Sequence, residues 1–299
     1  MSHRNSAVRA LLGSILVTVA LPAIADSNDD RLRGDDLQLA EIANRIAIAG
    51  ARRCQNLMPA TGLVITVIDQ YPPGLRKKVD QIFPVKIEGV APGLAADRAG
   101  LRGGDRLLTF GDQMLVWLPL APSPTSATRD GVERQIIALP PHAPISVEVL
   151  RDGHSVKAVL EPVAACRTRF EVVETMQLFA RSDGEMIQLS SAYVERFGED
   201  GVAVAFAHEL AHTVLGHRAA IAATSGSNRS QLSRQAERDA DKLSVHLLSA
   251  AGYDPAIAPR FWREHGGELG RRFFGGKHDS PGKRIKLLEA EIAAMQSSP

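Results

Sequence analysis

The pattern H-E-x-x-H at residues 208–212 constrains this 299-residue chain more than any other feature of its sequence. Residues four apart on a helix share one face and lie about 6 Å apart along the axis, so His208 and His212 can reach one metal ion. Glu209 lies one step round the helix, where its carboxylate can contact a metal-bound water. The surrounding residues are rich in alanine, valine and phenylalanine. Because burying these polar groups there is costly without compensation, the pattern predicts a metal centre; the alternative is a satisfied pair of core histidines.

A catalytic zinc ion needs three protein ligands and one open coordination position, so a third ligand must be found. His217 is the nearest candidate, but its spacing is poor. The metzincin pattern requires glycine at position 215 and histidine at position 218, where this chain has Leu215 and Arg218. The third ligand is therefore expected on another element.

A second predicted helix, from about residue 230 to residue 251, carries the run ERDAD at 237–241. We expect Glu237 to be the third ligand of one Zn²⁺ per chain. Asp241 lies one turn later on the same face, where it can accept the free ring N–H of His208 and fix the tautomer of that ligand. The alternative is a solvated charged face, because acidic and basic residues alternate there. The H-E-x-x-H pattern favours the metal site.

These two motifs together resemble those of the HtpX-like and Ste24-like gluzincin zinc metallopeptidases, especially their soluble exported members. The resemblance covers about residues 166–299 and implies a mainly helical zinc domain with a small sheet, in which Glu209 is the general base. Residues 183–190 resemble the strand that these enzymes place before the active-site helix. An extended substrate is therefore expected along an edge strand formed by Met186, Ile187, Gln188 and Leu189.

The C-terminal segment extends this resemblance. The pattern His278-x-Ser280-x-x-x-Arg284 is similar to a histidine-proline-serine and arginine motif of the family, although Asp279 stands where proline is usual. The resemblance implies that His278 or Arg284 stabilises the oxyanion that develops during peptide hydrolysis.

Residues 62–165 differ from the rest of the chain, since β-rich and alternating segments replace long helices. Asp152-Gly153 between two alternating runs predicts a hairpin. The stretch 90–108 resembles a bacterial PDZ domain. Such a domain binds a peptide as an added strand, so this module is expected to recruit protein substrates, with Thr61-Gly62-Leu63 as one candidate for its carboxylate-binding loop. The alternative is a module that only packs against the catalytic domain.

The N-terminus is typical of a secretory signal peptide. Basic residues precede an apolar run, and the triplet Ala23-Ile24-Ala25 predicts cleavage after Ala25 and export to the periplasm or another extracytoplasmic space. The alternative is an uncleaved anchor or a disordered start. Cleavage would remove two arginines and no acid, which changes the formal net charge from +1 to −1 and argues against nucleic acid as a partner. No later segment has about 18 consecutive apolar residues, so no membrane span is expected after cleavage.

An oxidising compartment would allow Cys54 and Cys166 to form a disulfide bond. The two cysteines are 112 positions apart and lie at the two edges of the predicted β module. Closing a loop of that length stabilises a fold by about 4–5 kcal/mol in the chain-entropy model. Two unpaired buried thiols are the alternative.

These observations predict an α+β chain in four parts. They are a signal peptide (1–25), an N-terminal helix capped by Asp35 or Asp36 that packs on the catalytic domain (26–61), a mostly β PDZ-like domain (62–165) and a zinc metallopeptidase domain (166–299). The expected function is a zinc endopeptidase of the bacterial cell envelope, which cleaves unfolded or misassembled proteins with a zinc-activated water and Glu209 as base. The rival is a non-enzymatic periplasmic chaperone or PDZ adaptor with a structural or autoinhibited zinc site. The presence of Glu209 argues against that rival, because a structural site does not need this carboxylate.

Overall fold

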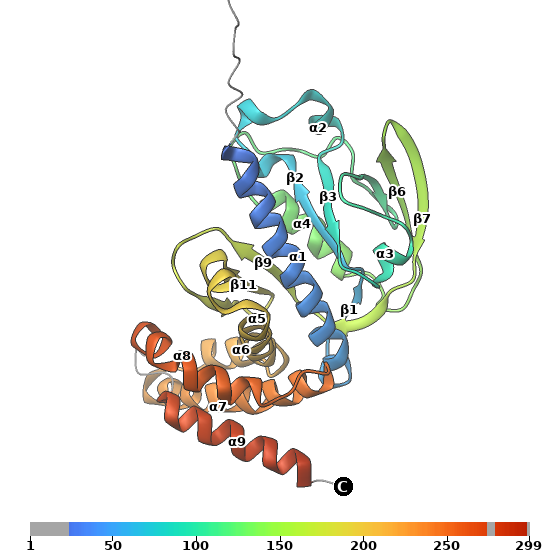
Figure 1. The fold of residues 1–299 in the computed structure, drawn as a ribbon. Helices are drawn as coiled ribbons and strands as arrows, with labels where there is room; N and C mark the ends of the chain where they lie inside the picture. The colour runs from blue at the N-terminus through green and yellow to red at the C-terminus, as the bar shows by residue number, and fades with distance from the viewer. Residues whose placement is uncertain (1–23, 274–278, 298–299) are drawn as a thin grey trace, which may run out of the picture.

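The computed structural model describes residues 24–273 and 279–297, which form an α+β structure as expected (Figure 1). The larger sheet belongs to the β module, is antiparallel throughout, and has the strand order β2-β3-β4-β6-β7 with the short β5 paired to β4. Its strands alternate buried and more exposed side chains because one face covers a hydrophobic core. The module contains β2 (Leu63–Val67), α2 (Lys78–Ile82), β3 (Val85–Val90), α3 (Ala95–Arg98), β4 (Arg106–Phe110), β5 (Gln113–Met114), α4 (Ala127–Ile137), β6 (Ile145–Arg151) and β7 (His154–Leu160).

The predicted hairpin is confirmed at the turn between β6 and β7. Asp152 and Gly153 adopt φ values of 50° and 82°, which are the left-handed conformations that a two-residue hairpin turn requires.

A two-stranded antiparallel ribbon lies where the chain enters and leaves the module. It pairs β1 (Leu57–Ala60) with β8 (Val163–Cys166). The structure contains the expected disulfide between Cys54 and Cys166, whose Cα atoms are 5.4 Å apart. The ribbon and the disulfide therefore hold the two chain crossings side by side.

The chain after β8 forms a small sheet with the strand order β10-β11-β9 and then a set of helices. The helix that carries H-E-x-x-H begins earlier than expected, because Ser190 caps its first turn by accepting the N–H of Tyr193, and it is interrupted at Gly198, where φ is 58°. These elements are β9 (Arg169–Val173), β10 (Ala180–Ser182), β11 (Met186–Ser190), α5 (Ser191–Val214), α6 (His217–Ala222), α7 (Gly226–Ala250), α8 (Ile257–Phe273) and α9 (Pro281–Ser297).

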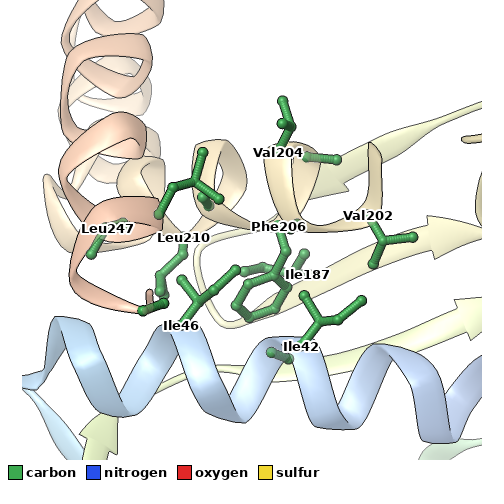
Figure 2. Close-up of a cluster of buried hydrophobic side chains, with 14 of the residues drawn as sticks. Ile42, Ile46, Ile187, Val202, Val204, Phe206, Leu210 and Leu247 are labelled. Carbon is green, nitrogen blue, oxygen red and sulfur yellow. The ribbon is translucent and has the colours of Figure 1, made fainter. Parts of the chain in front are cut away.

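The first helix, α1 (Ile24–Gly50), contacts both parts of the molecule, as its course in Figure 1 shows. Leu37 packs on β3 at Gly89, where a Cβ atom would come within 2.5 Å of the leucine side chain. Further along, Ile42 and Ile46 point into the core of the helical part, toward Phe206 on α5 (Figure 2). The helix therefore ties the β module to the part that carries the H-E-x-x-H motif.

Like Asp35, Asp36 does not cap this helix, because the helix continues toward the N-terminus as far as Ile24. Its carboxylate instead accepts a hydrogen bond from the Val172 N–H of β9 at 2.9 Å. Burial, as the largest effect, raises the pKa of Asp36 to about 6.

A second contact between the two parts is an interdomain charge cluster made by Arg129 and Glu133 of α4 with Arg169 and Glu171 of β9. Arg129 pairs with Glu171, and Arg169 Nη1 lies 3.3 Å from Glu133 Oε2. The Arg169 side chain is only 4% exposed. Burial raises the pKa of Glu133 to about 7 even though both arginines oppose this shift.

Within the described ranges, none of the helices combines the length and the apolar character needed to cross a membrane. The expected signal peptide falls outside these ranges except for Ile24 and Ala25, which begin α1.

Candidate metal centre

The structure brings the three expected metal ligands together. His208 and His212 project from one face of α5, and their Nε2 atoms are 3.2 Å apart. Glu237 reaches them from α7: its Oε2 lies 3.3 Å from His208 Nε2, and its Oε1 lies 3.6 Å from His212 Nε2. The ligand atoms of these three residues all lie within 4.8 Å of one another.

This spacing fits a tetrahedral zinc site. Bonds of 2.0–2.1 Å at tetrahedral angles place neighbouring ligand atoms about 3.3 Å apart. The two Nε2 atoms are 3.2 Å apart, and the Glu237 carboxylate lies 3.3 Å from the first through Oε2 and 3.6 Å from the second through Oε1, so each separation is close to that value. Two imidazoles and one carboxylate are also a donor set that zinc accepts, and they leave a fourth position for water or substrate.

Asp241 lies behind the first ligand, as its position one turn after Glu237 predicts. Its Oδ1 is 3.0 Å from His208 Nδ1, the ring nitrogen that faces away from Glu237. Burial alone would lower the pKa of His208, but its hydrogen bonds to Asp241 and Glu237 outweigh burial and raise this pKa to about 10. The carboxylates therefore orient the imidazole and increase its basicity.

Arg284, one of the two expected oxyanion donors, lines the cavity beside the three expected ligands. Its guanidinium is buried and binds both oxygens of Asp241, with Nε donating to Oδ2 at 2.7 Å. The centre of the guanidinium also lies 3.7 Å from the centroid of the Trp262 ring on α8. Burial would raise the pKa of Asp241, but Arg284 and His208 reverse this effect and hold the pKa below its usual range. Arg284 thus holds the carboxylate that contacts His208.

His278, the other expected oxyanion donor, lies outside the described residues. Asp279, which replaces the usual proline of the resembling motif, forms an ion pair with Arg238 of α7 at 2.7 Å. This pair joins the chain just before α9 to the helix that carries Glu237.

His217 is a residue of the site whose role the sequence did not reveal. It is not close to the Nε2 side of the histidine pair. Instead, its Nδ1 lies 2.9 Å from Nδ1 of His212, and the residue is only 8% exposed. Burial and then the neighbouring His212 lower the pKa of His217 to about 4, so its imidazole is neutral near pH 7.

A cavity of about 530 Å³ opens onto these groups and is also lined by Glu209. One side of its wall is the strand β10, through Ala180, Arg181 and Ser182. Other parts of the wall are apolar and come from α5, α8 and α9, including Val204, Phe261 and Leu288. The cavity volume is within the range of small-molecule and peptide side-chain pockets.

The expected substrate strand occupies a different place from the one predicted. Met186, Ile187, Gln188 and Leu189 do form β11, but β11 is the middle strand, paired with β10 on one side and β9 on the other. Its backbone groups are therefore used within the sheet. The sheet edge that lines the cavity belongs to β10. Its edge position depends on the order of the strands in the sheet, which no local sequence pattern indicates.

The candidate carboxylate-binding loop of the β module borders a small space in this structure. This space, beside β2 and α4, measures about 90 Å³. Its remaining walls come from α1, β1 and β9, through residues that include Asp36, Pro59 and Phe170. Thr61-Gly62-Leu63 borders this space, but Thr61 Oγ1 already accepts the Leu63 N–H at 3.3 Å.

No family model matches the chain. The chain is 32% identical over 129 residues to the mitochondrial metalloendopeptidase OMA1 of Schizosaccharomyces pombe. This match covers 33% of the chain and 38% of the relative, so the chain corresponds to well under half of that protein's length. The relative belongs to the class of metal-dependent peptidases that the site geometry suggests.

Several solved protein structures resemble parts of the chain at low similarity. The HtrA-type protease AlgW with a decapeptide is 23% identical, covers 36% of this chain and 30% of its own, and has a TM-score of 0.26. The HtrA3 PDZ domain bound to a phage-derived ligand is 16% identical, with coverages of 37% and 90% and a TM-score of 0.26. Similarities of this size do not assign an activity.

Proposed function

We propose that this chain is a zinc-dependent endopeptidase of the gluzincin type, related to the HtpX-like and Ste24-like enzymes. The observation that carries the proposal is the approach of two histidine Nε2 atoms and the Glu237 carboxylate to within 3.2–3.6 Å of one another, at a cavity that Glu209 also lines. The partial similarity to a metalloendopeptidase supports the same reaction class.

In this proposal His208, His212 and Glu237 hold one Zn²⁺. When bound, zinc supplies Lewis-acid chemistry that polarises a carbonyl oxygen and lowers the pKa of water toward about 7. Glu209 accepts the proton of the attacking water and delivers it to the amine of the leaving group. Asp241 accepts the Nδ1–H of His208 and so keeps its Nε2 directed toward the metal.

The proposed substrates are unfolded or misassembled proteins. β10 is the sheet edge beside the cavity, and an extended segment can add to such an edge as a further strand. Folded proteins keep most of their extended segments paired within their own sheets, whereas unfolded chains offer them freely. The signal-like N-terminus and the disulfide support export to an oxidising compartment, such as the bacterial periplasm.

The direct test is cleavage of casein and of a quenched fluorescent peptide by the exported, purified protein. We expect metal analysis to find one zinc per chain, a zinc chelator to abolish cleavage, and added zinc to restore it. A tightly folded protein of similar size serves as a substrate control and should stay intact. Full zinc occupancy with no cleavage of any unfolded substrate would instead support a non-enzymatic chaperone or adaptor.

A further inference from the structure

We propose that His217 is a positioning residue for the second metal ligand: it accepts a hydrogen bond from Nδ1–H of His212 and thereby directs Nε2 of His212 toward the metal. This inference rests on the proposed zinc site. It assigns a role to a histidine that metal-ligand spacing alone had left without one.

The backbone brings His217 back onto the helix that has just ended. Gly216 adopts φ 65° and ψ 24°, a left-handed conformation that reverses the chain direction after α5 and that favours glycine. His217 is the first residue of α6 and returns against the last turn of α5. Its ring meets the His212 ring edge to face, with 5.0 Å between centroids and 73° between planes.

The proposed metal site determines which ring nitrogen carries the proton in His212 and in His217. Nε2 of His212 faces Glu237 and His208, so this nitrogen must offer its lone pair to a bound metal. The proton of the neutral His212 ring is then on Nδ1. Because Nδ1 of His217 lies 2.9 Å away, that atom must be the acceptor, and the single ring proton of His217 is on Nε2.

The two histidine ligands are therefore held by different kinds of groups. His208 donates to Asp241, a carboxylate that Arg284 holds in place. His212 donates to a neutral imidazole. Partners of this kind fix the tautomer and the ring orientation of a metal-bound histidine, and their loss commonly weakens metal binding by about 10–100-fold.

The test compares His217→Gln with His217→Met. The two new side chains are similar in size, but only glutamine has a strong acceptor for the His212 N–H. Zinc dissociation constants are measured by competition with a chromophoric chelator, at a temperature where circular dichroism shows each variant folded. We expect His217→Met to bind zinc about 10–100-fold more weakly than the parent, and His217→Gln to recover much of that loss. The visible spectrum of the cobalt-loaded protein should change in His217→Met and stay close to the parental spectrum in His217→Gln.

A matched control is His246→Met, since His246 is another partly buried histidine, paired with Glu291 at 2.8 Å and absent from the cavity wall. This variant should bind zinc as the parent does. Equal zinc affinities for the parent and both His217 variants would overturn the proposal. A parent protein that binds no zinc would overturn the proposed function itself, which is a separate outcome.

A measurement on the parent protein keeps the proposal testable if His217→Met does not fold. ¹⁵N NMR of the zinc-loaded protein distinguishes protonated from unprotonated ring nitrogens. We expect a protonated Nδ1 in His212 and an unprotonated Nδ1 in His217. A protonated Nδ1 in His217 would contradict the proposed direction of the hydrogen bond.

Discussion

Arg284 on α9 and Asp241 on α7 form a buried ion pair through both carboxylate oxygens, with Arg284 Nε 2.7 Å from Asp241 Oδ2. Their side chains are only 6% and 4% exposed. Because the same carboxylate contacts His208, this pair links the packing of the C-terminal helix to the orientation of a proposed metal ligand. Changes in this pair should therefore affect both stability and metal binding.

Arg284→Met should destabilise the fold by about 3–5 kcal/mol, because it leaves the Asp241 carboxylate buried without its main cation. Arg263→Met is the control, since Arg263 pairs with Glu289 at the surface, where loss of a pair costs about 1 kcal/mol or less. Urea unfolding of both variants measures the difference. Equal, small decreases in the free energy of unfolding for the two variants would mean that the buried Asp241 carboxylate does not need Arg284 for its stabilisation.

Glu237→Ala should abolish tight zinc binding while the protein stays folded, because two histidines alone make a weak site. Asp239→Ala is the control, because it removes an acidic residue of the same helix. The Asp239 side chain accepts a hydrogen bond from Gln235 and does not bond to the histidines, so this variant should keep one zinc per chain. Metal analysis after dialysis against a weak chelator is the measurement. Full zinc occupancy in Glu237→Ala would remove Glu237 from the ligand set.

The interdomain charge cluster should make stability depend on pH through Glu133. Its pKa rises from the ordinary value of 4.5 to about 7 on folding, so the folded protein binds this proton more tightly than the unfolded chain. This contribution to stability is complete below about pH 4.5 and is lost as the pH rises through 7. Urea midpoints at pH 5 to 8 should therefore fall less steeply in Glu133→Gln than in the parent.

The control for this pH series is Glu161→Gln, which changes an exposed glutamate of the same β module. Its stability curve should run parallel to that of the parent. Parallel curves for Glu133→Gln and the parent would show that Glu133 does not titrate differently in the folded state.

Replacing both Cys54 and Cys166 by serine should lower the free energy of unfolding by about 4–5 kcal/mol in the chain-entropy model, because the unfolded chain regains a loop of 112 residues. Thiol titration of the denatured, unreduced parent should find no free thiol. Two free thiols per chain would show that the bridge does not form in the exported protein.

The sequence could predict those parts of the site that depend on helix periodicity. The spacing of His208 and His212 places both rings on one face, and the same logic relates Glu237 to Asp241. The partner of Arg284 could not be predicted in this way, because it depends on how α9 packs on α7. Likewise, the family resemblance of residues 183–190 indicated the β11 strand correctly, but strand order made β10 the edge beside the cavity. The position of His217 had a sequence indication in the preceding Gly216. A glycine in the left-handed conformation after a helix reverses the chain, which brings the next side chain back against that helix.

The substitution Glu209→Gln tests the central claim most directly, because it removes the proposed base and keeps the size of the side chain. Glu185→Gln makes the same change at an exposed glutamate, whose side chain is 73% exposed, and controls for the loss of one carboxylate. We predict that Glu209→Gln keeps one zinc per chain and the parental stability, yet cleaves casein at least about 100-fold more slowly, while Glu185→Gln cleaves at the parental rate. Zinc-loaded Glu209→Gln that cleaves casein as fast as the parent would contradict the proposed mechanism.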